Sequence, residues 1–96
     1  MLTNIYRYEI AEPVAIGEVE DTLLLALAAA ENLHGASQVR LDAEHAFDPV
    51  LRVCVVNAAT DVGRDLNKLF AGFLTREFGA SAFRVERIAP APTTTV

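Results

Sequence analysis

The segment Val50–Gly79 constrains the fold more than any other part of the chain. It opens with a β-branched run of strand length, Val50-Leu51-Arg52-Val53-Cys54-Val55-Val56. Thr60 and Asp61 then provide a natural helix start. Apolar residues recur after that at helical spacing: Val62, Leu66, Leu69, Phe70, Phe73, Leu74 and Phe78. This pattern predicts a buried strand followed by an amphipathic helix that ends at Gly79.

Within that helix, Phe70 and Phe73 continue the stripe set by Leu66 and Leu69, so both are predicted to anchor the core. Gly72 lies beside them. We expect it to permit close packing of the helix on a neighbouring element.

A strand and a helix are expected before this segment. Residues Ile5–Ile10 alternate, with Tyr6, Tyr8 and Ile10 on one face, which is typical of a half-buried strand. A helix is predicted from Glu18 to His34, with Gly35 as its C-terminal cap. Its core stripe comprises Val19, Leu23, Ala26, Leu27, Ala30 and Leu33.

Alternation returns in Gln38–Phe47, which predicts a second strand with Val39, Leu41, Ala43, His45 and Phe47 on one face. Asp48-Pro49 supplies turn chemistry, so this strand and the next should form a hairpin. An odd-length turn is preferred, which aligns Leu51, Val53 and Val55 with His45 and Phe47. A last strand is predicted over Ala82–Ile88.

The expected order is strand, helix, strand, strand, helix, strand within one α+β domain of residues 1–88. This order resembles a ferredoxin-like plait, which implies a four-stranded antiparallel sheet with two helices on one face. Strands one and three are expected to be central and antiparallel to strands two and four. Residues 89–96 are rich in Pro and Thr and should form a flexible tail. Because many unrelated functions share this fold, the resemblance carries little functional weight.

Composition excludes several classes of protein. The net charge of −5 argues against nucleic-acid binding, which requires clustered positive charge. The longest apolar run, Leu23–Ala30, is too short for a membrane span, and no secretory pattern opens the chain. With Cys54 as the single cysteine, a reducing cytoplasm is the expected location.

No catalytic or cofactor motif emerges. Acylphosphatase-like enzymes share this topology but need an arginine in the loop after strand one, and Ala11–Glu18 contains none. Metal-chaperone plaits use paired cysteines, which a chain with one cysteine lacks. His34, His45 and Cys54 show no ligand spacing and are interpreted as structural residues. We therefore expect no metal, no cofactor and, as the preferred alternative, no enzymatic activity.

Two polar groups are candidate interaction sites. At the start of the second helix, Asn57, Thr60, Gly63 and Arg64 either cap the helix or bind a small ligand such as an anion. On the open sheet face, alternation predicts four arginines from four strands, Arg7, Arg40, Arg52 and Arg84, interleaved with acidic residues. That face is either solvated and ion-paired or a self-complementary surface for a second subunit.

Leu24 and Leu25 fall outside the core stripe of the first helix, and they either widen its buried face or contact another subunit. We expect a two-fold homodimer, formed through the first helix or through an edge strand, Gln38–Phe47 or Ala82–Ile88. The leading hypothesis is a non-enzymatic, homo-oligomeric interaction module. The alternative is a regulatory plait that binds a small ligand of unknown identity near the start of the second helix.

Overall fold

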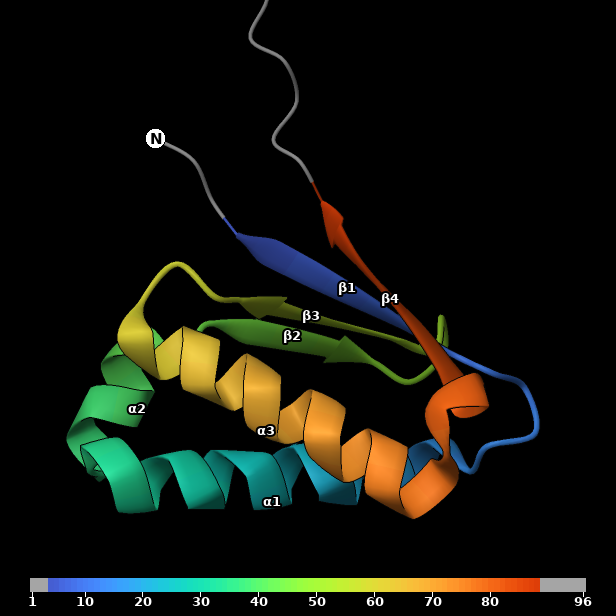
Figure 1. The fold of residues 1–96 in the computed structure, drawn as a ribbon, viewed down its shortest axis with the longest axis horizontal. Coiled ribbons are helices and arrows are strands. Elements are labelled where there is room, and N and C mark those ends of the chain that lie inside the picture. The colour runs from blue at the N-terminus through green and yellow to red at the C-terminus, as the bar shows by residue number, and fades with distance from the viewer. Residues whose placement is uncertain (1–3, 89–96) are drawn as a thin grey trace, which may run out of the picture.

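The computed structural model describes residues 4–88; the predicted tail at 89–96 lies outside them. Its elements are β1 (Ile5–Ile10), α1 (Ile16–His34), α2 (Ala36–Asp42), β2 (His45–Asp48), β3 (Val53–Asn57), α3 (Asp61–Phe78), the short helix η1 (Ala80–Ala82) and β4 (Phe83–Ile88). The strands form a layer with α1, α2 and α3 on one side of it (Figure 1). None of these helices combines the length and apolar composition needed to cross a membrane.

The sheet has the order β2-β3-β1-β4, and all neighbouring strands are antiparallel. This α+β arrangement is close to a ferredoxin-like plait, as the element order indicated. The relative direction of the two central strands was predicted wrongly: β1 is antiparallel to β3, so β1 is parallel to β2 and β3 is parallel to β4. The reason is that the connection through α1 and α2 is a crossover, which returns the chain in its starting direction.

The core is centred on β1 and α3. Tyr8 and Ile10 of β1 are buried. The buried members of the predicted stripe of α3 are Val62, Leu66, Phe70 and Leu74. The Tyr8 and Phe70 rings meet edge to face with centroids 4.9 Å apart. The Tyr8 hydroxyl donates a hydrogen bond to Asn67 Oδ1 at 2.6 Å, which satisfies its one polar group. Both elements were predicted with almost the observed bounds.

The helix α1 also follows its predicted stripe, with one exception. Val19, Leu23, Ala26 and Ala30 are buried, whereas Leu33 in the last turn is 63% exposed, so its assignment to the core was wrong. Gly35 ends the helix at φ 89°, a conformation that glycine adopts without steric cost, and its N–H donates to the carbonyl of Glu31.

The N-terminal half of the predicted strand Gln38–Phe47 is helix. Residues Ala36–Asp42 form α2, and only His45–Asp48 form a strand. Val39 and Ala43 are four residues apart, so a helix buries both on one face, and both are buried. The strand prediction also required a buried Leu41, which is instead 77% exposed. The segment fits both the spacing of a helix and the alternation of a strand, and only the exposure of Leu41 distinguishes the two.

The hairpin register also differs from the prediction. Phe47 pairs with Cys54 and His45 with Val56, so Cys54 and Val56 face the helices while Val53 and Val55 lie on the open face. The turn spans 49–52 and is even in length. The Asp48 carboxylate accepts hydrogen bonds from the N–H groups of Val50 and Leu51, each at 3.0 Å. A change of one residue in turn length moves every side chain of a strand to the opposite face.

The burial difference between Phe70 and Phe73 gives a test of the core. Phe70 is fully buried, whereas Phe73 is only partly buried at the edge of the core. We expect Phe70→Ala to lower the free energy of unfolding by about 3–5 kcal/mol, and Phe73→Ala to lower it by clearly less. Urea unfolding followed by circular dichroism measures both. Equal losses would show that Phe73 is a core anchor after all, as the sequence suggested.

Candidate functional site

The start of α3 brings together three of the four predicted ligand-binding residues. The Thr60 hydroxyl accepts a hydrogen bond from the Gly63 N–H and donates one to the Asp42 carbonyl, both at 2.9 Å. It therefore caps α3 and ties it to the end of α2. The Asn57 amide donates to Glu44 Oε1 at 2.8 Å, and its Oδ1 accepts from the Ala59 N–H.

Arg64, the fourth of these residues, forms an ion pair with Asp61 one turn earlier on the exposed side of α3. The hydrogen-bond and ion-pair partners described for these four residues are all groups of the same chain. The geometry fits the capping alternative, because the groups that would hold an anion already carry internal hydrogen bonds.

The chain's potential metal ligands and nucleophiles are dispersed. His34 Nε2 lies 2.8 Å from Asp65 Oδ2, and His45 Nδ1 lies 2.7 Å from the Ala43 carbonyl oxygen. Within residues 4–88, His, Cys, Asp and Glu side chains form no group of three that would hold a metal ion. Burial raises the pKa of the Cys54 thiol to about 12. This thiol is therefore protonated at neutral pH and a poor nucleophile.

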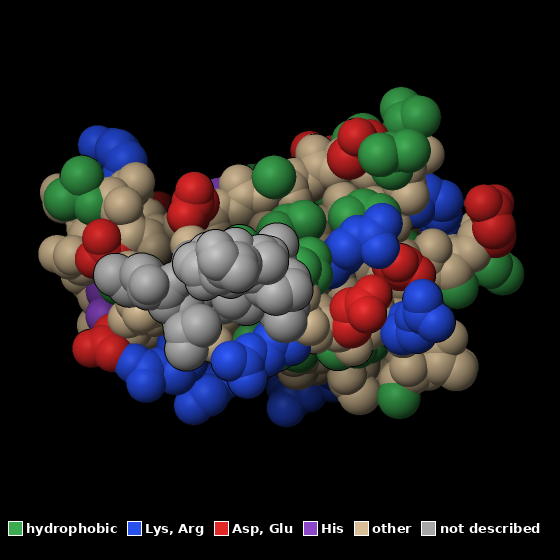
Figure 2. Space-filling model, turned by 90° about the horizontal axis from the view of Figure 1, so that it is seen from above, with side chains coloured by type: hydrophobic (Ala, Val, Ile, Leu, Met, Phe, Trp, Pro, Cys, Tyr) green, Lys and Arg blue, Asp and Glu red, His purple; other side chains and the backbone are tan. Residues whose placement is uncertain are grey.

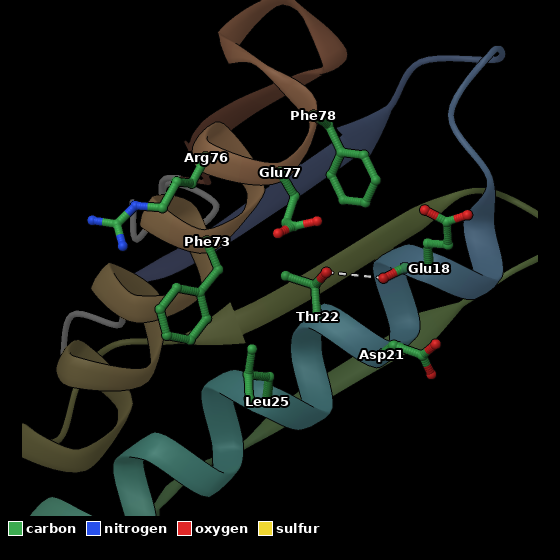
Figure 3. Close-up of a pocket in the computed structure, with 8 residues that line it drawn as sticks. All are labelled: Glu18, Asp21, Thr22, Leu25, Phe73, Arg76, Glu77 and Phe78. Carbon is green, nitrogen blue, oxygen red and sulfur yellow. Dashed lines mark hydrogen bonds between the residues drawn. The ribbon is translucent and has the colours of Figure 1, made fainter.

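A cavity of about 460 Å³ lies between α1 and α3, and the sequence pattern did not reveal it. Figure 3 shows Leu25 and Thr22 of α1 facing Phe73 and Phe78 of α3, with the Glu77 carboxylate between the two rings. Its other lining residues are Glu18, Asp21 and Arg76. The sequence contained only a weak indication of this cavity. Leu25 lies outside the apolar stripe of α1, and Phe73 and Phe78 lie at the edge of the apolar stripe of α3.

The open sheet face carries two of the four predicted arginines. Arg7 and Glu9 of β1 lie opposite Glu86 and Arg84 of β4. Arg84 Nη2 is 3.0 Å from Glu9 Oε1, and Arg7 also forms an ion pair with Glu9. Figure 2, which looks onto the sheet side of the molecule, shows acidic and basic side chains next to hydrophobic ones. These charges alternate in sign, as the sequence indicated for this face.

The other two arginines were assigned to this face wrongly. Arg40 is an exposed residue of α2, because the segment predicted as a strand is a helix. Arg52 lies in the hairpin turn at φ 59°. Its guanidinium donates hydrogen bonds to the backbone carbonyls of Ala11, at 2.7 Å, and of Val14. Arg52 therefore has a structural role, holding the β1–α1 connection against the turn.

The strand β4 is the longer edge strand of the sheet. Within residues 4–88 it pairs only with β1, and the side chains from Arg84 to Ile88 are exposed on both faces. The opposite edge, β2, is four residues long and is separated from α2 by Ala43 and Glu44. A longer strand with an unpaired edge is a template for pairing with another chain.

No protein-family model, curated protein or solved structure matches the chain.

The two glycines of α3 give a matched test of the local packing. A Cβ on Gly63 would lie 2.0 Å from the Asn57 carbonyl oxygen, whereas one on Gly72 would have nothing within 4 Å. The predicted close-packing role therefore belongs to Gly63, and its assignment to the exposed Gly72 was wrong. We expect Gly63→Ala to destabilise the fold by about 1–3 kcal/mol and Gly72→Ala to stabilise it by up to about 1 kcal/mol. Thermal unfolding of both variants measures this, and a stable Gly63→Ala protein would contradict the close contact.

Proposed function

We propose that this chain is a non-enzymatic interaction module of the cytoplasm that works as a homodimer. The observation that carries the proposal is the exposure of large apolar side chains on two separate surfaces of a small acidic domain. Of the exposed large apolar side chains, those on the expected interfaces are Leu24 and Leu25 on α1, and Val85 and Ile88 on β4. Large apolar side chains left in water are stabilised when a protein–protein contact covers them.

The chemistry of the remaining groups supports a binding role over catalysis. The Cys54 thiol is buried and protonated, and both histidines lie within hydrogen-bonding distance of groups of the same chain. The alternation of Arg and Glu on the open sheet face favours pairing with a copy of the same surface over binding of a uniformly charged ligand. A two-fold dimer is also the commonest closed assembly.

The oligomeric state tests this proposal directly. Native mass spectrometry and analytical ultracentrifugation at tens of micromolar should detect a dimer, and a monomer would overturn the proposal. Leu24→Glu combined with Leu25→Glu then separates the two surfaces, because each side chain is more than half exposed, at 58% and 59%. A monomer with an unchanged circular dichroism spectrum assigns the contact to α1, and a retained dimer assigns it to β4. Leu41→Glu, at an exposed leucine of α2, is the matched control.

The cavity between α1 and α3 favours small-ligand binding as a second candidate function, in a different place from the start of α3. Its volume of about 460 Å³ suits a small organic molecule. Phe73 and Phe78 offer aromatic surface, and the Glu77 carboxylate lies between them. Three carboxylates against one arginine favour a cation, so the matching ligand is an aromatic or alkyl amine.

Phenethylamine and phenylacetate are suitable probes for this cavity because they differ mainly in the sign of their charge. We expect phenethylamine to raise the melting temperature and phenylacetate to leave it unchanged. A ligand at 100 times its dissociation constant adds about 2.7 kcal/mol to the free energy of unfolding. Glu77→Gln should abolish the shift, and Glu20→Gln, at an exposed carboxylate of α1 outside the cavity, should not. Equal shifts with both probes would contradict the assignment.

A further inference from the structure

The backbone of β4 presents a defined set of hydrogen-bonding groups to the outside of the sheet. The Ile10 N–H donates to the Arg52 carbonyl on the β3 side, and the Ala11 N–H donates to the Ala82 carbonyl on the β4 side. In antiparallel strands this direction alternates from residue to residue. Arg84, Glu86 and Ile88 therefore direct their N–H and C=O groups toward β1, whereas Phe83, Val85 and Arg87 direct theirs away from it.

We propose that β4 pairs with β4 of a second copy in an antiparallel ladder whose two-fold axis passes through Val85. The four strands of each copy would then join into one continuous sheet of eight strands. This inference rests on the proposed homodimer and specifies its interface. The occupant of the edge is a second copy, because the charges on β4 complement themselves in one register.

The outward-facing groups restrict the register. An outward residue must lie opposite an outward residue, so a two-fold axis must pass through a residue of β4 and not between two residues. An axis at Phe83 or Ile88 would pair only that residue of the strand, and an axis at Arg87 would place two arginines opposite each other. An axis at Arg84 places two arginines opposite each other, and an axis at Glu86 places two glutamates opposite each other. The axis at Val85 instead pairs Arg84 with Glu86 of the second copy, twice. Opposite charges across a strand pair stabilise it and like charges destabilise it.

The same register extends the charge pattern already present within each chain. Glu9 lies opposite Arg84, and Arg7 lies opposite Glu86. Across the two-fold axis, neighbouring side chains on successive strands then form a row on the open sheet face. In order, this row contains Glu9, Arg84, Glu86 of the second copy and Arg7 of the second copy. The signs alternate along the whole row, and symmetry generates a second identical row. The open sheet face thus acquires a continuous network of ion pairs.

The helix-facing side of β4 fits the same arrangement. Val85 lies opposite the buried Tyr8 on β1, yet it is 39% exposed. In the dimer it meets Val85 of the second copy, which covers this apolar surface. Phe83 lies opposite Arg87 of the second copy, a pairing that allows a cation–π contact. Backbone, charge and apolar groups therefore all match in one register.

A pair of single-charge variants tests the register. In Arg84→Glu, each homodimer contact opposes two glutamates, and in Glu86→Arg it opposes two arginines. Mixing the two proteins restores both opposite-charge contacts in a heterodimer, while the internal contacts of each chain are the same as in its homodimer. We expect each variant alone to dimerise at least about tenfold more weakly than the native chain, and the mixture to recover native-like affinity as a heterodimer. Native mass spectrometry resolves the species by mass, and circular dichroism checks that each variant is folded.

Cysteine cross-linking supplies a second measurement. The two-fold axis brings both copies of Val85 together as a hydrogen-bonded pair with Cα atoms about 5.5 Å apart, a distance that a disulfide spans. Val85→Cys should form a covalent dimer on mild oxidation, whereas Val50→Cys, at the exposed hairpin turn, should not. The native Cys54 is buried and does not interfere.

The outcomes separate this inference from the proposed function. A native dimer that tolerates Arg84→Glu and Glu86→Arg without loss, or that leaves Val85→Cys uncross-linked, overturns the β4 register and retains the homodimer. A native chain that is monomeric at tens of micromolar overturns both. Lys68→Glu, a charge reversal at an exposed residue of α3, controls for the effect of net charge on association.

Discussion

The contacts of Tyr8 hold the two layers of this domain together. Its ring packs against Phe70 of α3 and lies 6.0 Å from the ring of Phe83 on β4. Its hydroxyl donates to Asn67, so the side chain is buried without leaving a polar group unpaired. Burial also raises the pKa of this hydroxyl, which keeps it protonated and available as a donor. The central strand, the main core helix and the edge strand thus depend on one residue.

The sequence predicted those elements whose periodicity fits only one structure. The apolar stripe of α3 and the alternation of β1 each specify one period and one buried face. The segment around Val39 did not, because residues spaced by four also satisfy a period of two. The hairpin register was equally inaccessible, since it depends on the turn geometry at Asp48 and on the positive φ of Arg52. A local sequence pattern does not determine strand register or turn geometry.

The candidate interaction surfaces were predicted correctly only where the strands or helices that carry them were predicted correctly. Arg7 and Arg84 were placed correctly on the open face because their strands were predicted correctly, whereas Arg40 and Arg52 were misplaced with theirs. Leu24 and Leu25 were left with two alternatives, and their exposure contradicts the one in which they widen the buried face of α1. The cavity between α1 and α3 could not be predicted, because its walls come from the margins of two helices that the sequence does not position relative to each other.

The hydrogen bonds of Arg52 bear on how the domain folds. A non-glycine residue at positive φ is disfavoured by roughly 1–2 kcal/mol, so this turn is a poor nucleus for a hairpin. Its guanidinium reaches the carbonyl of Ala11, 41 residues earlier in the chain. These bonds form only after β1 and β3 have paired, and they then offset the backbone cost. We therefore expect the β2–β3 turn to form late in folding, after the central strands have paired.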